Sequence, residues 1–179
     1  TLASTGSPGG LVLLSADDPG CHSSQNEQDN RYYARMAGLP CFEPATAQEA
    51  KDMTKDALLL SRRYEQPVLL RTTTRLNHLR GSVTYGELSD PAEIRKFKRN
   101  PMRFVPVPMV ARIRHGEMLE NLDRIRAEIE GSMWYKVWGK GKTGVIASGI
   151  SRAYLRDVLL EPEFEDRFKV LELGITWPF

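Results

Sequence analysis

The sequence holds few cysteines, few histidines and almost no net charge, and each shortage narrows the class of protein. Cys21 and Cys41 are its only cysteines, and their spacing fits neither a zinc knuckle nor an iron–sulfur motif. We therefore interpret them as two reduced thiols. The net charge is +2, from 25 basic and 23 acidic residues, so no overall field would attract nucleic acid or a membrane.

Long hydrophobic runs are also missing. The apolar runs at residues 11–14 and 57–60 are far shorter than the roughly 20 residues that a membrane helix needs. The first residues are small and polar, unlike a signal peptide. Because 41% hydrophobic content still allows a packed core, we expect a globular, cytoplasmic protein. The chain begins without Met and ends directly after the apolar run LELGITWPF, which suggests a piece of a longer protein.

The first half of the chain alternates short apolar runs with amphipathic segments. This order is typical of an α/β fold with a parallel sheet, flanking helices and right-handed crossovers. Thr46 and Glu49 have the spacing of a capping box, which predicts a helix start. We expect strands at residues 11–16, 41–43 and 68–73, and helices at residues 26–38 and 45–65.

The second half begins with a segment rich in proline and arginine. We divide the chain into residues 1–86, the later part of a first α/β domain; residues 87–140, a basic linker with a helix; and residues 141–179, the opening βαβ of a second α/β domain. Asp90 and Pro91 fit the start of a short helix. We further expect a helix at residues 108–130 with Leu119, Leu122, Ile125 and Ile129 on one stripe, an extended segment at 133–138, strands at 144–148 and 168–173, and a helix at 150–160.

A long polar loop follows the first predicted strand at residues 17–31. Ligands of open α/β sheets bind where loops leave the carboxyl ends of strands, and a connection alone needs two to six residues. Ser23, Ser24 and Asn26 would cap the next helix under one interpretation. Under the other, the loop faces a ligand, and His22 transfers protons because imidazole titrates near neutral pH. The candidate loop residues are His22, Ser23, Ser24, Gln25, Asn26 and Gln28.

Three separated segments carry a resemblance to a known family. ADDPG-x-HSSQNEQDNRYYA, LPCFEPATAQEAKDM and PVLLRTTTRLNHLRG, in this order, resemble the alpha subunit of indolepyruvate ferredoxin oxidoreductase, a thiamine-diphosphate-dependent 2-oxoacid:ferredoxin oxidoreductase. The resemblance covers residues 9–81 strongly, loosens from about residue 82 to 142, and returns at residues 144–179.

The resemblance implies an internal fragment of this oxidoreductase. The parent enzyme would oxidatively decarboxylate an arylpyruvate to acyl-coenzyme A, using thiamine diphosphate, magnesium and iron–sulfur clusters, with a beta subunit and ferredoxin as partners. Residues 9–81 resemble the later part of the pyrimidine-binding domain, and the candidate loop would face cofactor and substrate. The parts that bind the diphosphate, the magnesium and the clusters would lie outside this chain. We therefore expect no cofactor on the fragment and no activity of the fragment alone.

Other patterns leave alternatives open. GKGKTG at residues 139–144 is no phosphate loop, because it precedes a strand and Lys136 stands where the motif needs Gly. Ser151 in GISRA resembles a nucleophile elbow, but no histidine follows it, so we interpret it as a helix cap that lines a ligand cleft.

The basic cluster at residues 95–114 is either a solvated face or a surface for an acidic partner, and its prolines argue against nucleic acid. Arg71 and Arg75, like His78 and Arg80, would face an anionic group or acidic neighbours. A non-enzymatic interaction module is the main alternative function, and a small-molecule binding domain is the third. With few strands in each sheet, we also expect a homo-oligomer that buries the stripe at residues 119–129 and the segment 170–179.

Overall fold

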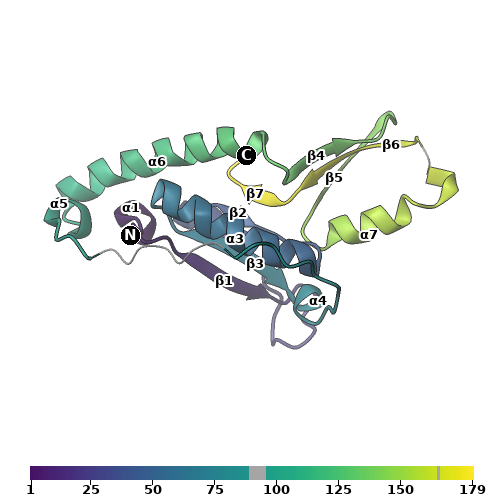
Figure 1. Cartoon of the computed structure of the whole chain (residues 1–179), viewed down its shortest axis with the longest axis horizontal. Coiled ribbons are helices and arrows are strands. Elements are labelled where there is room, and N and C mark those ends of the chain that lie inside the picture. The colour runs from purple at the N-terminus through teal and green to yellow at the C-terminus, as the bar shows by residue number, and fades with distance from the viewer. Residues whose placement is uncertain (89–95, 165) are drawn as a thin grey trace.

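The computed structural model describes residues 1–88, 96–164 and 166–179, and it shows an elongated molecule with two sheets (Figure 1). In the first sheet, the strand order is β1-β3-β2-β7. The predicted parallel sheet with flanking helices is confirmed, because β3 pairs in parallel with both β1 and β2. The strands are β1 (Val12–Asp17), β2 (Cys41–Phe42), β3 (Val68–Thr73) and β7 (Ile175–Trp177).

Helices cover both faces of this first sheet. The helices of this half are α1 (Leu2–Thr5), α2 (Arg31–Ala37), α3 (Ala47–Tyr64) and α4 (Thr74–Asn77), followed by α5 (Pro101–Phe104) and the long α6 (Pro108–Glu130). On one face, Met53 and Ala57 of α3 pack with Phe42 and Leu70 of the strands. On the other, the small residue Ala34 of α2 packs beside Cys41, Leu69, Met118 and Leu122.

The second sheet extends from the first one (Figure 1). Its strand order is β4-β6-β5, with β4 antiparallel and β5 parallel to the central strand β6. Its elements are β4 (Tyr135–Trp138), β5 (Thr143–Ser148), α7 (Ser151–Val158), a short 3-10 helix η1 (Pro162–Phe164) and β6 (Phe168–Leu173). The GKGKTG segment forms the connection from β4 to β5 and the first two residues of β5, and α7 begins only after β5, so the rejection of a phosphate loop is confirmed.

The strand count was wrong in both sheets. We expected three strands in the first sheet and two in the second, whereas the described residues give four and three. After β6 the chain returns to the first sheet, where β7 pairs antiparallel with β2. The second sheet gains β4, the segment predicted only as extended. The expected oligomer surfaces were wrong as well, because Leu122, Ile125, Ile129, Val170, Leu173 and Ile175 are buried inside the chain.

Helix α2 begins later than predicted, at Arg31 rather than at residue 26. Its apolar side chains Tyr32, Tyr33 and Met36 are 61–79% exposed, and Ala34 is the buried residue. Leu119 is likewise exposed, and Met118 takes its place on the buried stripe of α6.

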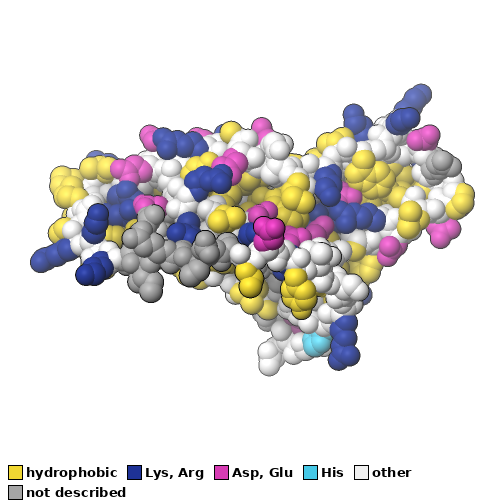
Figure 2. All heavy atoms as spheres, viewed as in Figure 1, with side chains coloured by type: hydrophobic (Ala, Val, Ile, Leu, Met, Phe, Trp, Pro, Cys, Tyr) yellow, Lys and Arg dark blue, Asp and Glu magenta, His cyan; other side chains and the backbone are white. Residues whose placement is uncertain are grey.

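Basic side chains gather at the end of the molecule where α5 and α6 lie (Figure 2). Arg103 bonds to Glu65 and to the carbonyl of Thr5, and Arg114 bonds to the carbonyl of Ser4. These two arginines of the basic cluster therefore hold the N-terminal segment. The short helix predicted at Asp90 lies outside the described residues.

Candidate functional site

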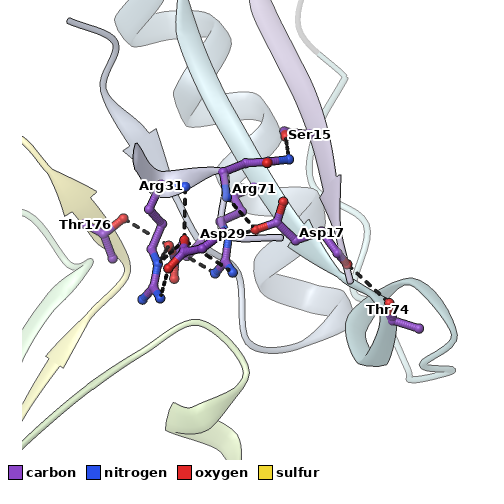
Figure 3. Close-up of polar contacts among 9 residues, drawn as sticks. Ser15, Asp17, Asp29, Arg31, Arg71, Thr74 and Thr176 are labelled. Carbon is purple, nitrogen blue, oxygen red and sulfur yellow. Dashed lines mark hydrogen bonds and ion pairs between the residues drawn. The ribbon is translucent and has the colours of Figure 1, made fainter. Parts of the chain in front are cut away.

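The polar loop of residues 17–31 leaves the carboxyl end of β1, as predicted, and is fastened to the sheet at both of its ends. Asp17 is the last residue of β1, and its Oδ2 accepts a hydrogen bond from Nε of Arg71 on β3 at 2.5 Å. The same oxygen accepts one from the backbone N–H of Asn30 at 2.9 Å. The Asn30 side chain donates to Ser15 Oγ at 2.7 Å (Figure 3). The two ends of the loop therefore meet at one buried carboxylate.

Arg71 is the centre of a buried charge cluster (Figure 3). Its side chain is 7% exposed and contacts Asp17, Glu43 at 3.4 Å and Asp29 at 3.8 Å. The Arg31 guanidinium donates two hydrogen bonds to Asp29, at 2.8 and 2.6 Å, and the Arg31 backbone N–H donates a third at 3.2 Å. These bonds hold the pKa of Asp29 below its usual value. The arginines thus neutralise carboxylates that would otherwise repel one another at the strand ends.

Asp18 organises the first turn of the loop. Its Oδ2 accepts hydrogen bonds from the backbone N–H groups of Ser23 and Ser24 at 2.6 and 2.7 Å. Its Oδ1 accepts one from the Thr74 hydroxyl at 2.6 Å, and His22 Nδ1 lies 3.4 Å away. The Thr74 hydroxyl, followed by the Ser23 amide, holds the pKa of Asp18 well below its usual range. Asp18 is therefore an anion bound to its own loop.

The six predicted loop residues all lie on this anchored loop, and none of them is fully buried. His22, Ser23, Gln25 and Asn26 are exposed, while Ser24 and Gln28 are half-buried. The alternative that Ser23, Ser24 and Asn26 cap α2 is wrong. The N-cap residue is Asn30, and it makes no side-chain capping bond. The backbone N–H groups of Ser23 and Ser24 instead donate hydrogen bonds to Asp18. These bonds stabilise a turn inside the loop and do not cap α2.

Sequence reasoning missed the anchoring residues Asp17, Asp18 and Glu43. Arg71 was singled out together with Arg75, and the structure separates them. Arg71 satisfies acidic neighbours, whereas Arg75 is exposed and contacts Tyr154. His78 and Arg80 are exposed, and Ser151 begins α7 without capping it. Two of the missed anchoring residues could have been found in the sequence, because Asp17 and Asp18 are adjacent carboxylates at the end of a predicted strand.

A third group of contacts joins the two sheets. Arg152 of α7 is 2% exposed and donates to the carbonyl of Glu43 at 2.9 Å and to Glu49 of α3 at 2.5 Å. Arg156 and the Trp138 indole both bond to the buried Glu172. These contacts lower the pKa of Glu172 against the opposing effect of its burial. The second sheet is thereby fixed beside the strand ends of the first.

The described residues hold no group of His, Cys, Asp and Glu arranged to bind a metal ion. Within the same residues, no helix is long and apolar enough to cross a membrane.

Comparison with known proteins defines the class of the fold. No protein-family model matches the chain. A solved structure of 2-oxoglutarate:ferredoxin oxidoreductase from Magnetococcus marinus, with 2-oxoglutarate, coenzyme A and succinyl-CoA bound, superposes with a TM-score of 0.64. It covers 99% of this chain and 39% of that chain at 13% identity. The chain therefore has the fold of a segment of a 2-oxoacid:ferredoxin oxidoreductase.

Sequence comparison identifies more similar relatives, which share one name. The chain is 46% identical to indolepyruvate oxidoreductase subunit IorA of Thermococcus kodakarensis over 97% of its length, and 44% identical to IorA of Methanothermobacter thermautotrophicus over all of it. These alignments span 28% and 29% of the two relatives, so the chain matches less than a third of each. The resemblance to the alpha subunit of indolepyruvate ferredoxin oxidoreductase is confirmed.

Proposed function

We propose that the chain is part of an enzyme that oxidatively decarboxylates indolepyruvate or a related arylpyruvate to its acyl-coenzyme A, with ferredoxin as electron acceptor. The observation that carries this proposal is the 42–46% identity to IorA subunits, which in five of the six alignments covers 97% or more of the chain. The similarity includes the whole anchored loop. The fragment itself is expected to be inactive, because it spans less than a third of such a subunit.

The strand-end edge fits one wall of a thiamine diphosphate site. Thiamine diphosphate supplies the nucleophilic carbon and the electron sink that decarboxylation of a 2-oxoacid needs. Asp17 Oδ1 and Glu43 Oε2 are buried at this edge without a hydrogen-bond partner among the described residues. Such acceptors suit the amino and ring groups of a pyrimidine. Magnesium and iron–sulfur clusters would be held by other parts of the complete enzyme.

In this proposal the residues of the chain have separate tasks. Arg71, Asp17 and Asn30 hold the loop in place. His22 and its neighbours Ser23, Ser24, Gln25, Asn26 and Gln28 face cofactor and substrate, and His22 moves a proton between the reacting groups and water.

The proposed partners are a beta subunit, ferredoxin and coenzyme A, in a cytoplasmic enzyme. A homo-oligomer stays a prediction, now with the exposed side chains of Tyr32, Tyr33 and Met36 as its surface, and light scattering over a wide concentration range tests it. The alternative of a non-enzymatic interaction module is not favoured. The homologues are oxidoreductase subunits, and Arg103 and Arg114 of its basic segment are occupied inside the chain.

A segment exchange tests the proposal. In the complete Methanothermobacter thermautotrophicus enzyme, the matching part of IorA is replaced by this chain, and indolepyruvate-dependent reduction of ferredoxin is measured. The control carries the same segment from IorA of Methanothermobacter marburgensis. We expect both enzymes to be active with indolepyruvate. A folded, assembled enzyme that is active with the control segment and inactive with this chain would refute the proposal.

A further inference from the structure

A cavity of about 250 Å³ lies between the anchored loop and α7, and none of the contacts described above fills it. One side comes from the loop and from the end of β3, and the other from the start of α7. The cavity is smaller than the 300–1,000 Å³ typical of sites for a whole ligand, so it suits a single chemical group. Its lining residues are Pro19, His22, Thr73, Thr74, Arg75, Ile150, Ser151 and Tyr154.

Arg75 gives this cavity an available positive charge. Its NH1 donates to the Tyr154 hydroxyl at 3.1 Å, and its guanidinium lies 5.7 Å from the centre of the Tyr154 ring. Among the described residues, no carboxylate lies within ion-pair distance of Arg75. A tyrosine therefore holds the guanidinium in place and leaves its charge uncompensated, which is the arrangement that binds an anion well.

Thr73 supplies an unused hydrogen-bond donor in the same wall. The residue is 9% exposed, and its Oγ1 is buried with no hydrogen-bond partner in the part of the chain that the structure describes. A buried hydroxyl normally finds a partner, because leaving it without one costs free energy. A ligand oxygen in the cavity would provide that partner.

Charged groups of both signs surround the cavity. Asp18 lies beside it, but its carboxylate already accepts bonds from Ser23, Ser24 and Thr74. On the other side, Ser151 is the first residue of α7, whose N-terminal end carries a positive partial charge.

We propose that this cavity binds an oxyanion, the phosphate or carboxylate group of a small molecule, with Arg75 as the cation and Thr73 as a hydrogen-bond donor. His22 belongs both to this cavity and to the loop that is proposed to face cofactor and substrate, but oxyanion binding needs only Arg75, Thr73 and their geometry. It also places a ligand group between the two sheets, where binding would pull α7 toward the loop.

The strand offers a matched pair of variants for the test. Thr73→Val removes the buried hydroxyl of a residue that lines the cavity. Thr72→Val removes the hydroxyl of the neighbouring residue, which is also buried without a partner but does not line the cavity. Arg75→Gln removes the charge, and Arg112→Gln removes an exposed charge on α6. Inorganic phosphate and acetate are titrated into the full chain and each variant, and the backbone amide signals of residues 150–152 are followed by NMR.

We expect saturable shifts of these amides with at least one of the two anions. Thr73→Val should weaken binding about three- to tenfold, the effect of one hydrogen bond, and Arg75→Gln at least tenfold. Thr72→Val and Arg112→Gln should bind as the unmodified chain does. Tighter binding of phosphate indicates a phosphorylated ligand, and tighter binding of acetate a carboxylate; both support an oxyanion site.

Shifts that do not saturate with either anion would overturn the proposal, as would equal weakening by Thr73→Val and Thr72→Val. If Thr73→Val does not fold, the comparison of Arg75→Gln with Arg112→Gln tests the proposal, and equal anion binding by these two variants would overturn it. This outcome is independent of the segment exchange, because anion binding is measured without catalysis.

Discussion

Arg71 Nε lies 2.5 Å from Asp17 Oδ2, across 54 residues of sequence, and both side chains are almost completely buried. The pair joins β1 to β3 at their carboxyl ends, and Asn30 bonds to the same Asp17 oxygen from the far end of the loop. Removing one partner from a buried ion pair leaves the other charge without compensation. The loop and the sheet are therefore expected to lose stability together.

Replacement of Arg71 by Met tests this coupling. The variant keeps most of the side-chain volume, leaves Asp17 without its cation and leaves Glu43 with only Arg31 at 3.8 Å, so the free energy of unfolding should fall by about 3–5 kcal/mol. Urea unfolding followed by circular dichroism measures the change. Arg124→Met, at an exposed ion pair of 3.9 Å on α6, is the control and should change it by less than about 1 kcal/mol. Similar losses in both variants would show that the buried cluster has no special role.

The lowered pKa of Asp18 predicts that the folded chain loses stability in acid. Its folded-state pKa lies below the ordinary value of 3.8, so the ionised carboxylate stabilises the folded chain. This contribution is complete above that ordinary value and is lost as the pH falls through the lower folded-state pKa. The stability difference between the unmodified chain and Asp18→Asn should therefore be largest near neutral pH and shrink below about pH 4. Asp157→Asn is the control for the loss of one charge elsewhere, and a difference that does not change with pH would contradict the prediction.

The two cysteines should differ in reactivity. Cys41 is buried in β2, and burial raises the pKa of its thiol to about 12, so little thiolate is available at pH 8. Cys21 is exposed on the loop. A thiol reagent at pH 8 should modify one cysteine per chain quickly, and peptide mass spectrometry should identify it as Cys21. Modification of Cys41 should require denaturant; equal rates in the native chain would mean that β2 opens readily.

Arg152 should control how firmly the second sheet is held. Arg152→Met removes the bonds to the Glu43 carbonyl and to Glu49, while β7 still connects the two parts. We expect hydrogen exchange to become faster in β4, β5 and β6 than in β1 and β3. Arg167→Met, which removes a surface arginine of the same half, is the matched control and should leave both sheets protected. Uniformly faster exchange with Arg152→Met would indicate general destabilisation and not a joint between the sheets.

In the complete enzyme, His22→Ala or Asn26→Ala should reduce turnover more than stability. Both side chains are exposed on the loop, so their removal leaves the core intact. Steady-state kinetics with indolepyruvate and a melting curve are compared for each variant. Asn77→Ala, at an exposed position on α4, is the control for Asn26. A drop in melting temperature that matches the loss of turnover would favour a structural role.

Local signals in the sequence predicted local structure well. Thr46 caps α3 and accepts a hydrogen bond from the Glu49 amide at 3.1 Å, as the capping pattern indicates, because cap and partner lie three residues apart. The three parallel strands were also found from their apolar runs. Helix α2 was predicted to start five residues too early, because backbone amides of the preceding loop donate to Asp18 and do not continue the helix.

Long-range pairing could not be predicted in the same way. The Arg71–Asp17 contact, the Arg152 contacts and the return of β7 to the first sheet join residues 54 to more than 100 positions apart. Tyr32, Tyr33 and Met36 fall at helical spacing, yet in this chain the helix face that they form is exposed. Periodicity identifies a face that favours burial, and only the neighbouring segments decide what covers it.

The return of β7 determines how this segment can be exchanged between genes. A crossover near residue 140 would take β7 from one parent and β2 from the other, and would separate the strand that carries Trp177 from the edge at Cys41. Recombination there would make the β2–β7 pairing of the first sheet depend on strands from two parents, even though the cut falls between two secondary-structure elements. Residues 12–177 are therefore expected to be inherited, and best transplanted, as one unit.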